Sequence, residues 1–456
     1  MQFHRRDFVK LGLAGAAIGG LSPVFRSPLF QRTLDAATFG GGSSAKKMLV
    51  IFLRGGNDGV NTVIPYGDPE YNVSNRPNIF IPDTSSIDLG NGFAALHPAL
   101  SEFATVYAAG DVAILHRVGY DELNRSHFEG QHYWENGIPG DSETEQGWIH
   151  RQVLESYDLA ANPLAAASIS DRLMVLFKGP EALPHIADLA TYGLDVAGAS
   201  QEKLLGTLPS GGTGSGLLGW YGRSLESGHG YDSLLGSTGL AMGETLQALE
   251  DAGIDPSTYV PENGAVYPDA GNPQGFANAS LDFFSQIRDA AMLLKQTDLR
   301  VAGVEISGFD THAGQGGENG AHANLLSTIG LAVRSLSQDL QSIWNDTLVV
   351  TLSEFGRTSE QNGSNGTDHG EASCMFVAGG SVNGGVYNCD ATTWAPGDMF
   401  STPNARYVSQ RTDYRAVIGE ILDRHFGLTA PQRDIVIPGL SSQIGVPEFD
   451  PLSFLP

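Results

Sequence analysis

The fold class is decided by residues 48–59, which read MLVIFLRGGNDG. Met48–Leu53 is a continuous apolar run, and Arg54–Gly59 is a polar, glycine-rich segment that follows at once. A continuous apolar run is typical of a strand covered on both faces, as in parallel sheets, whereas a half-exposed strand alternates apolar and polar residues. The stretch therefore predicts a buried strand followed by a loop rich in functional groups.

The rest of the chain repeats this pattern. Four more apolar, β-rich segments are found at Val112–Val118, Val301–Ile306, Thr347–Leu352 and Ala372–Ala378. Helical periodicity is found at Pro98–Ala109, Trp148–Tyr157, Leu281–Leu294, Ala323–Trp344 and Tyr414–Phe426. The alternation predicts an α/β fold with a mostly parallel, doubly wound sheet flanked by helices. Because Pro209–Gly219 is nearly all Gly, Ser and Thr, we expect an insertion around residues 205–275 within a single domain of residues 46–456.

The N-terminus resembles a targeting signal rather than part of the folded domain. Arg5 and Arg6 precede Leu11–Leu21, a short, weakly apolar stretch rich in Gly and Ala. A paired arginine before such a stretch resembles a twin-arginine export signal, although an amphipathic helix or an anchor is the alternative. We predict a signal at residues 1–37, cleaved near Ala37. The expected location is periplasmic or extracellular, reached in the folded state through the twin-arginine translocase as a partner.

Composition excludes several classes of partner. The 456 residues include 26 Lys and Arg against 51 Asp and Glu, a formal charge of -25. Such an acidic chain repels phosphate at long range, so nucleic acid and anionic membranes are poor partners, although the same balance also suits a merely soluble surface. No apolar run is long enough to span a bilayer, so we expect no integral membrane span. Cys374 and Cys389 could form a disulfide or stay independent, and the sequence leaves both alternatives open.

Polar clusters lie at the ends of the predicted strands. They follow four strands, at residues 54–59, 124–129, 308–312 and 353–357, and a fifth cluster at residues 366–370 precedes the last strand. In open α/β sheets, ligands bind outside the carboxyl ends of the strands. We therefore expect these distant segments to converge on one site.

The clusters contain carboxylates and imidazoles in a metal-binding mixture. The predicted metal ligands are Asp58, Asp310, His312, Glu354, Asp368 and His369. So many carboxylates would repel one another without a cation, and mixed oxygen and nitrogen ligands favour a divalent ion. We expect one or two ions, zinc or manganese first and calcium as a third choice. Six ligands suit a binuclear site that clamps a phosphoryl oxyanion.

Catalytic candidates lie in the same clusters: Ser126, Arg125, His127 and Arg357. At a helix N-terminus, Ser126 could act as a nucleophile, but it could also be a helix cap in a capping box with Glu129. Arg125 or Arg357 could hold a substrate oxyanion with two hydrogen bonds. Two of the predicted ligands also have simpler interpretations. Asp58 fits a tight turn, and Glu354 fits an ion pair with Arg357.

Several separated motifs resemble one bacterial family. They are LVIFLRGGNDGVN at 49–61, LHPAL at 96–100, SHF at 126–128, GFDTHA at 308–313, SEFGRT at 353–358 and GTDHG at 366–370. In this order they resemble the bacterial domain-of-unknown-function family 1501, whose members commonly carry twin-arginine signals. That family is thought to be a distant relative of the alkaline phosphatase and sulfatase superfamily.

The resemblance implies an alkaline-phosphatase-like sheet with a two-metal site at the strand ends. On this mapping Asp58 is the first-strand metal ligand, Ser126 stands at the nucleophile position, and His369 is the last histidine ligand. Asp310 and His312 resemble the superfamily's aspartate–histidine pair, although they are closer together than usual. Glu354 stands where an aspartate–histidine dyad often follows a strand, and Phe355 replaces the histidine.

Two functions follow from these observations. The first is an exported, metal-dependent hydrolase of phosphate or sulfate esters, whose partner is a small anionic ester substrate. The alternative is a non-catalytic exported binding or assembly protein that keeps the hydrolase fold, which the Phe355 departure and the Gly/Ser-rich insertion motivate. A redox protein is disfavoured, because the chain has no dinucleotide fingerprint, haem motif or cysteine cluster.

Overall fold

A computed structural model describes residues 46–121, 124–192, 217, 220–221 and 230–456. Within it, Lys46–Pro456 forms one compact unit. The predicted signal at residues 1–37, and nearly all of the Gly/Ser-rich stretch Pro209–Gly219, lie outside the described residues. Part of the predicted insertion is described and is not all loop, because α9 (Gly230–Asp251) is a helix.

The main sheet confirms the fold class, and all five predicted strands are present. Its order is β10 (Gly385–Tyr387), β5 (Val112–Gly119), β9 (Ser373–Ala378), β8 (Thr347–Leu352), β1 (Lys47–Arg54), β7 (Val301–Ser307) and β6 (Ala166–Ser168), and β11 (Thr412–Asp413) also pairs with β5. β1 is central and pairs in parallel with β7 and β8, where Leu49 lies beside Ala302 and Val349. All eight residues of β1 are buried, as its apolar run predicts.

One strand departs from the parallel pattern. β9 runs antiparallel to both of its neighbours, β5 and β8. The segment between β8 and β9, residues 353–372, contains no helix, so it cannot make the crossover that a parallel neighbour usually needs. The chain instead turns back at the carboxyl edge. As a result, the start of β9 lies at the edge where β1, β5, β7 and β8 end.

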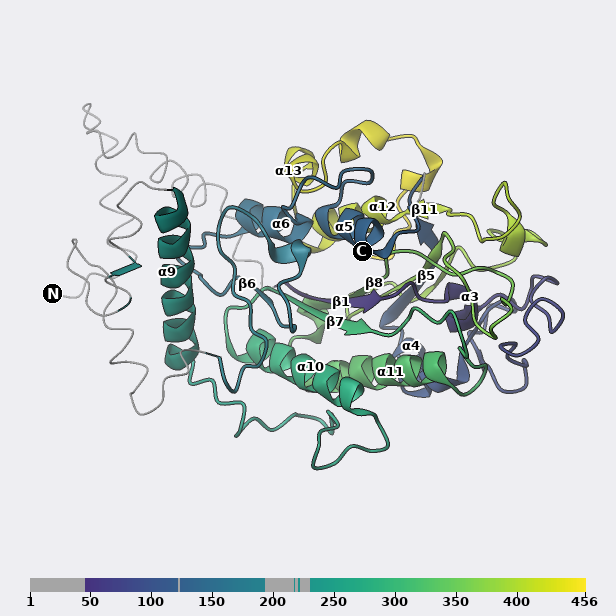
Figure 1. Cartoon of the computed structure of the whole chain (residues 1–456), viewed down its shortest axis with the longest axis horizontal. Coiled ribbons are helices and arrows are strands. Elements are labelled where there is room, and N and C mark those ends of the chain that lie inside the picture. The colour runs from purple at the N-terminus through teal and green to yellow at the C-terminus, as the bar shows by residue number, and fades with distance from the viewer. Residues whose placement is uncertain (1–45, 122–123, 193–216, 218–219, 222–229) are drawn as a thin grey trace. The chain divides into compact units, whose positions relative to one another are not determined.

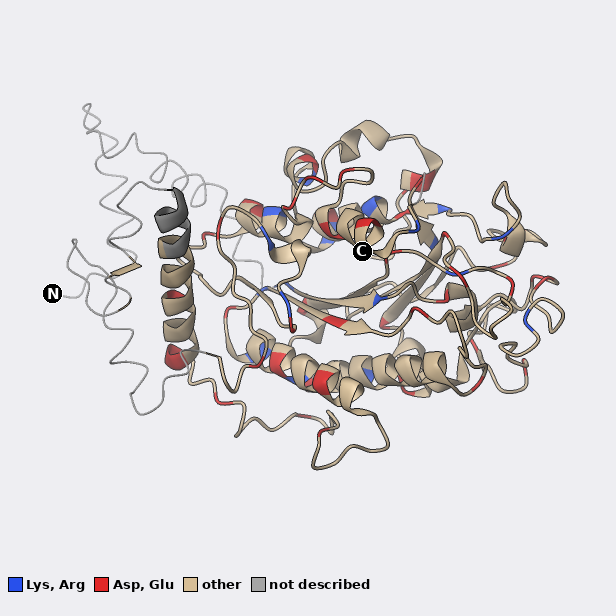
Figure 2. Ribbon diagram, viewed as in Figure 1, with Lys and Arg blue, Asp and Glu red and all other residues tan. Residues whose placement is uncertain are grey.

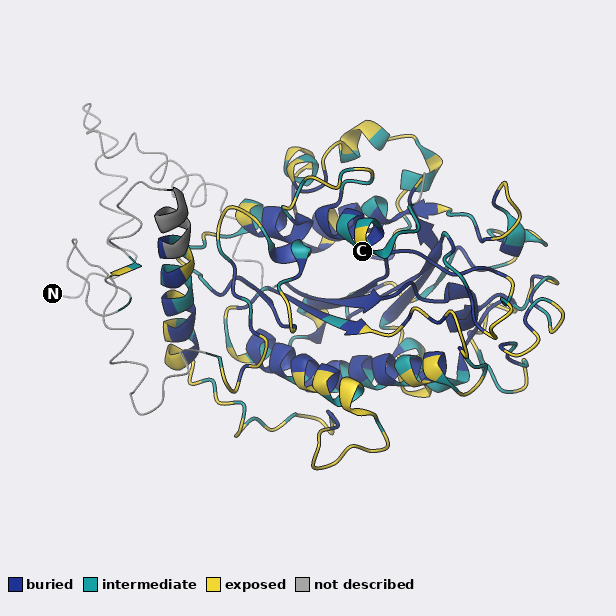
Figure 3. Ribbon diagram, in the orientation of Figure 1, coloured by how far each residue is buried: buried dark blue, intermediate teal, exposed yellow. Residues whose placement is uncertain are grey.

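Helices cover both faces of this sheet (Figure 1). On one face lie α4 (Ser101–Ala108), α10 (Asn278–Gln296) and α11 (Ala321–Asp339), and on the other lie α5 (His127–Asn136), α6 (Trp148–Ser156), α12 (Tyr414–Glu420) and α13 (Ala430–Val436). The alternation along β1 explains this, because Leu49, Ile51 and Leu53 enter one core and the residues between them enter the other. Figure 3 shows the strands buried and the outer helix faces exposed.

The predicted helices are present with shifted ends. Pro98–Leu100 is a 3-10 turn that leads into α4, and Ile421–His425 is a π turn that continues α12. The remaining short elements are α3 (Gly59–Thr62), a small antiparallel sheet of β2 (Val63–Ile64), β4 (Ala95–Leu96) and β3 (Ile87–Asp88), and 3-10 turns at Val175–Phe177, Trp344–Asp346, Asp398–Phe400, Leu440–Gln443 and Pro447–Phe449. Among the described helices, none combines the length and apolar character needed to cross a membrane. Cys374 and Cys389 are both buried free thiols.

A buried histidine near the C-terminus should make stability depend on pH. His425 donates from Nε2 to the carbonyl of Lys47 at the start of β1 (2.9 Å), and burial lowers its pKa from 6.5 to about 4. The unfolded chain therefore binds the proton first, so folded protein loses stability as pH falls from 6.5 towards 4. His425→Gln keeps the donor without the titration. We expect wild type to lose about 2–3 kcal/mol relative to this variant between pH 7 and pH 4.

Urea unfolding of both proteins at several pH values measures this difference. Because the variant shares every other titrating group, the difference between the two curves isolates His425. Parallel curves over the whole range would show that His425 does not titrate as its burial requires.

Candidate metal centre

The polar clusters converge at the carboxyl edge of the sheet, as the sequence predicted. His127 begins α5 after β5, Asp310 and His312 follow β7, and His369 precedes β9. His369 reaches this edge only because β9 is antiparallel, since a parallel β9 would start at the opposite edge. The direction of one strand therefore completes the cluster.

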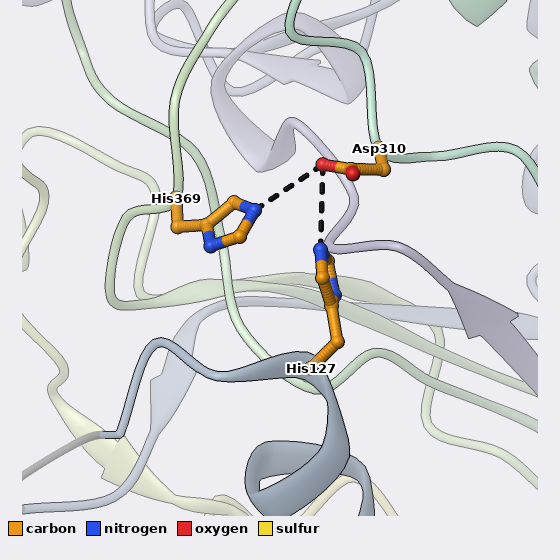
Figure 4. Close-up of side chains that lie close together, drawn as sticks. All are labelled: His127, Asp310 and His369. Carbon is orange, nitrogen blue, oxygen red and sulfur yellow. Dashed lines mark hydrogen bonds and ion pairs between the residues drawn. The ribbon is translucent and has the colours of Figure 1, made fainter.

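Three imidazoles surround one carboxylate oxygen. Asp310 Oδ1 lies 3.4 Å from His127 Nε2, 3.2 Å from His312 Nε2 and 3.3 Å from His369 Nε2. Figure 4 shows the side chains of His127 and His369 pointing at Asp310 from two elements. One ligand atom each from His127, Asp310 and His369 lies within 4.8 Å of the other two. In a tetrahedral site with metal–nitrogen distances of about 2.0–2.1 Å, ligand atoms lie about 3.3 Å apart, so this spacing fits an ion.

Each imidazole is also held from behind. His127 Nδ1 contacts Glu354 Oε1 (2.8 Å), His369 Nδ1 contacts the carbonyl of Arg125 (2.8 Å), and His312 Nδ1 contacts Asp368 Oδ1 (2.9 Å). All three partners only accept hydrogen bonds, so each Nδ1 carries a proton, and in a neutral imidazole the Nε2 atom then keeps its lone pair. Carboxylate or carbonyl groups behind histidine ligands are the usual outer shell of metal sites.

The three Nε2 atoms face the Asp310 carboxylate, and two of them also face each other. His127 Nε2 is buried and has no hydrogen bond within the described residues. His312 Nε2 and His369 Nε2 lie 2.9 Å apart, where two lone pairs repel each other unless a cation or a proton lies between them. The three imidazole nitrogens and the Asp310 carboxylate oxygen therefore fit the ligand set of a divalent ion.

Glu354 is placed behind the cluster rather than in it. It is fully buried, and its Oε1 accepts from Gly55 N, His127 Nδ1 and Gln131 Nε2, each at 2.8 Å. Burial raises the pKa of Glu354, but these hydrogen bonds outweigh burial and hold the pKa below its usual range. The hydrogen bond that His127 donates to Glu354 raises the pKa of His127. Glu354 Oε2 is buried without a hydrogen-bond partner in the described chain.

Close backbone packing brings these loops together. A Cβ atom at Gly55, whose φ is +118°, would lie 2.3 Å from the backbone nitrogen of Asp310. Only glycine allows this approach without a clash. The Arg-Gly-Gly segment after β1 therefore lets the Asp310 loop pack directly on the loop that contacts Glu354.

Arg357 holds the loops together. The sequence predicted that its guanidinium could bind a substrate oxyanion, but the guanidinium is buried among protein groups. It is buried, and its Nη2 lies 2.5 Å from Asp310 Oδ1. Its other hydrogen bonds go to backbone carbonyls of Gly55, Gly56, Phe309 and Thr367. Burial raises the pKa of Asp310, but Arg357 outweighs burial and lowers it, so Asp310 is held ionised.

Asp58 is not brought into the cluster. Its carboxylate is buried against Arg76, with Nη1–Oδ2 at 2.8 Å and Nη2–Oδ1 at 3.3 Å, and Gln315 Nε2 donates to Oδ2 at 2.6 Å. Asp58 also caps α3 by accepting from Asn61 N. The buried guanidinium of Arg76 supplies the positive charge that a metal ion was expected to supply to Asp58. The simpler interpretation of Asp58 as a turn residue is the one its geometry supports.

Breaking the buried ion pair between Arg76 and Asp58 should strongly lower the free energy of unfolding. Arg76→Met would leave the buried Asp58 carboxylate without its counter-charge, and breaking such a pair typically costs about 3–5 kcal/mol. We expect that loss in urea unfolding, with substantial recovery in the double variant that also carries Asp58→Asn. No recovery in the double variant would show that Arg76 acts through its backbone contacts with Thr358 and Ser359 instead.

Ser126 stands at the N-terminus of α5, directly before His127. It is half-buried, and its side chain makes no capping hydrogen bond. The expected capping box is therefore absent, because Glu129 accepts from Asn124 instead. Ser126 precedes His127 directly, so the first free N–H groups of this ten-residue helix belong to the same turn as His127. Arg125, the other cationic candidate, pairs with Glu371.

Phe355 supports the imidazoles from below. Its ring is buried, with its centroid 4.8 Å from both the His127 and the His369 rings. The departure from the superfamily pattern at this position therefore contributes packing. The sequence did not reveal Arg76 or Gln315, because neither lies in a recognisable motif. His127 was named as catalytic, and its position beside Ser126 was the signal that found it.

Comparison with known proteins gives one family match over part of the chain. Residues 243–438 match the family model described as a protein of unknown function, DUF1501. This confirms the resemblance over that range, which includes Asp310 and His369. A search of curated proteins finds no match.

Solved structures with some likeness to the chain include three enzymes. The alkaline phosphatase from the Antarctic bacterium TAB5 is 11% identical, with coverage of 76% of this chain and 96% of that one and a TM-score of 0.31. The phosphonate monoester hydrolase of Agrobacterium radiobacter is 14% identical, with 84% and 74% coverage and a TM-score of 0.30. The lipoteichoic acid synthase LtaP from Listeria monocytogenes is 8% identical, with 87% and 76% coverage and a TM-score of 0.27.

Proposed function

We propose that this DUF1501 chain is an exported, metal-dependent hydrolase of phosphate or sulfate esters. The observation that supports it is the set of three Nε2 atoms around Asp310 Oδ1, each imidazole fixed from behind through Nδ1. Such pre-set lone pairs are costly to maintain in a protein without a ligand for them. Export is proposed from the paired Arg5 and Arg6 alone, with the twin-arginine translocase as the partner in transit.

The donor set favours zinc or manganese. His127, His312 and His369 supply nitrogen and Asp310 supplies oxygen, whereas calcium prefers oxygen ligands throughout. Among the described residues, the group whose ligand atoms all lie within 4.8 Å of one another is His127, Asp310 and His369, with His312 beside it, so we propose one ion rather than the two that six ligands had suggested. A divalent ion there would supply positive charge to the oxyanion that develops during ester hydrolysis.

The chain's own residues would supply the rest. Ser126 offers a hydroxyl with no hydrogen-bond partner in the described structure, at the helix end where N–H groups and the helix dipole stabilise negative charge. Asp310 is held ionised by Arg357, and Glu354 sets the orientation of His127. These placements support Ser126 as the nucleophile towards phosphorus or sulfur.

Turnover of 4-nitrophenyl phosphate and 4-nitrophenyl sulfate by metal-loaded protein tests the proposal. We expect hydrolysis of at least one ester, lost on chelation and restored by zinc or manganese. Bound metal without turnover of any phosphate or sulfate ester would favour the alternative, a binding or assembly protein that keeps the site.

Glu354→Gln tests the outer shell. The variant keeps an oxygen that can accept from His127 Nδ1 but removes the charge that makes His127 a stronger ligand. We expect metal affinity to fall by about 10–100-fold. The new amide N–H2 group would lie where buried Oε2 has no partner among the described residues, so we also expect the free energy of unfolding without metal to fall by about 1–3 kcal/mol. Competition against a chromogenic chelator measures it, and an unchanged affinity would remove Glu354 from the account of the site.

A further inference from the structure

A second cationic group lies at the rim of the proposed metal site. Arg406 Nη2 is 4.0 Å from Asp368 Oδ2, and Asp368 is the carboxylate that holds His312. The Arg406 side chain is 58% exposed, and its guanidinium makes no hydrogen bond to any described residue. An ion pair this exposed contributes little to stability, because water screens it. Stability therefore gives little reason for Arg406 to lie here.

The backbone nevertheless fixes where Arg406 starts. Ala405 has a φ of +52°, a left-handed conformation that is unfavourable for a residue other than glycine. The carbonyl of Arg406 accepts from Ser359 N (3.0 Å), and Tyr407 is buried directly after it. A strained turn that presents a weakly paired, exposed cation beside a site points to a ligand contact.

Arg125 lies at the same rim, but its charge is more fully neutralised than that of Arg406. The guanidiniums of Arg125 and Arg406 both lie over the ring of Tyr407, at 4.4 and 5.6 Å from its centroid. Arg125 is paired with Glu371, whereas Arg406 has only the distant Asp368. Figure 2 shows acidic residues along many of the described loops and helices.

Charge at the site explains why a negatively charged ligand group fits there. The acidic groups are Asp310, Glu354, Asp368 and Glu371, and the basic groups are Arg125, Arg357 and Arg406. These sum to about -1, and a divalent ion would turn the site net positive. Arg406 is separated from Asp310 by Asp368 and His312, so it is placed for a part of the substrate beyond the reacting ester.

We propose that Arg406 is a specificity residue for esters whose leaving group carries its own negative charge, such as a carboxylate. This rests on the proposed hydrolase function. The reacting phosphate or sulfate group would lie at the three imidazoles, and the second anion would lie at the Arg406 guanidinium, whose donors fit a carboxylate. An uncharged leaving group would gain nothing from Arg406.

Binding of two non-hydrolysable phosphonates tests this without turnover. Phenylphosphonate and 4-carboxyphenylphosphonate differ only in the carboxylate, and calorimetry on the zinc-loaded whole chain at low salt compares them. The variants are Arg406→Gln and Arg406→Lys. The matched control is Arg424→Gln, because Arg424 is 54% exposed and lies 3.9 Å from Asp423 in a similar weak pair away from the site.

We expect wild type to bind the carboxylated phosphonate about fivefold or more tightly than the plain one. Arg406→Gln should abolish that preference and leave phenylphosphonate affinity unchanged, Arg406→Lys should keep part of it, and Arg424→Gln should keep all of it. The preference should shrink as salt rises.

Two results would overturn the proposal. If both phosphonates bind wild type and Arg406→Gln leaves their ratio unchanged, Arg406 has no role in specificity and the hydrolase function stands. If neither phosphonate binds zinc-loaded wild type, the hydrolase function falls, and this proposal falls with it.

Discussion

Asp310→Asn is expected to lower zinc affinity by more than about 100-fold and to remove ester hydrolysis. The carboxylate is the only charged group among the four proposed ligands, and its Oδ1 lies 3.2–3.4 Å from all three imidazole Nε2 atoms. An amide oxygen is a weaker ligand and leaves Arg357, 2.5 Å away, without its counter-charge. Removal of the carboxylate should therefore weaken the site more than removal of any outer-shell group.

Asp346→Asn is the matched control for this experiment. Asp346 is 44% exposed against 43% for Asp310, and it pairs with Lys46 away from the site. Zinc affinity should be unchanged in the control. Equal zinc affinity in wild type and Asp310→Asn would mean that metal, if bound, is bound elsewhere.

Ser126→Ala is expected to reduce ester turnover by at least about 10³-fold while zinc affinity stays the same. The hydroxyl is not a ligand in the proposed site, and it makes no capping hydrogen bond to α5. A serine that capped the helix would instead cost about 0.5–2 kcal/mol of stability when replaced by alanine. The absence of a cap therefore separates a catalytic role from a structural one.

Steady-state kinetics and urea unfolding of the same Ser126→Ala sample distinguish these roles. The account requires lost turnover with an unchanged free energy of unfolding. Retained turnover would show that another group attacks the ester, and lost turnover with a destabilised helix would show a structural role for the hydroxyl.

The apolar runs and polar clusters predicted much of this structure. The run Met48–Leu53 was enough to predict a strand buried on both faces, because two cores need two apolar faces. The direction of β9 was not predicted, because direction depends on whether the connection crosses over the sheet. Apolar composition is the same for either direction.

Residue type indicated which side chains gather at the candidate site, but not which of them face the cluster and which lie behind it. Asp310, His312 and His369 lie together at the predicted edge of the sheet, whereas Glu354 and Asp368 contact Nδ1 atoms behind the imidazoles. Sequence cannot separate a ligand from its outer-shell partner, because both are carboxylates in the same loops. Asp58 differs for another reason, since its counter-charge, Arg76, lies in a loop with no motif.

The metal content of the folded, purified chain tests the central claim most directly. After loading with zinc and removal of excess, we predict one ion per chain in wild type, and a content near zero in the double variant His127→Gln, His369→Gln with the fold retained. A wild-type chain that holds no zinc, or a double variant that holds as much as wild type, would contradict the account.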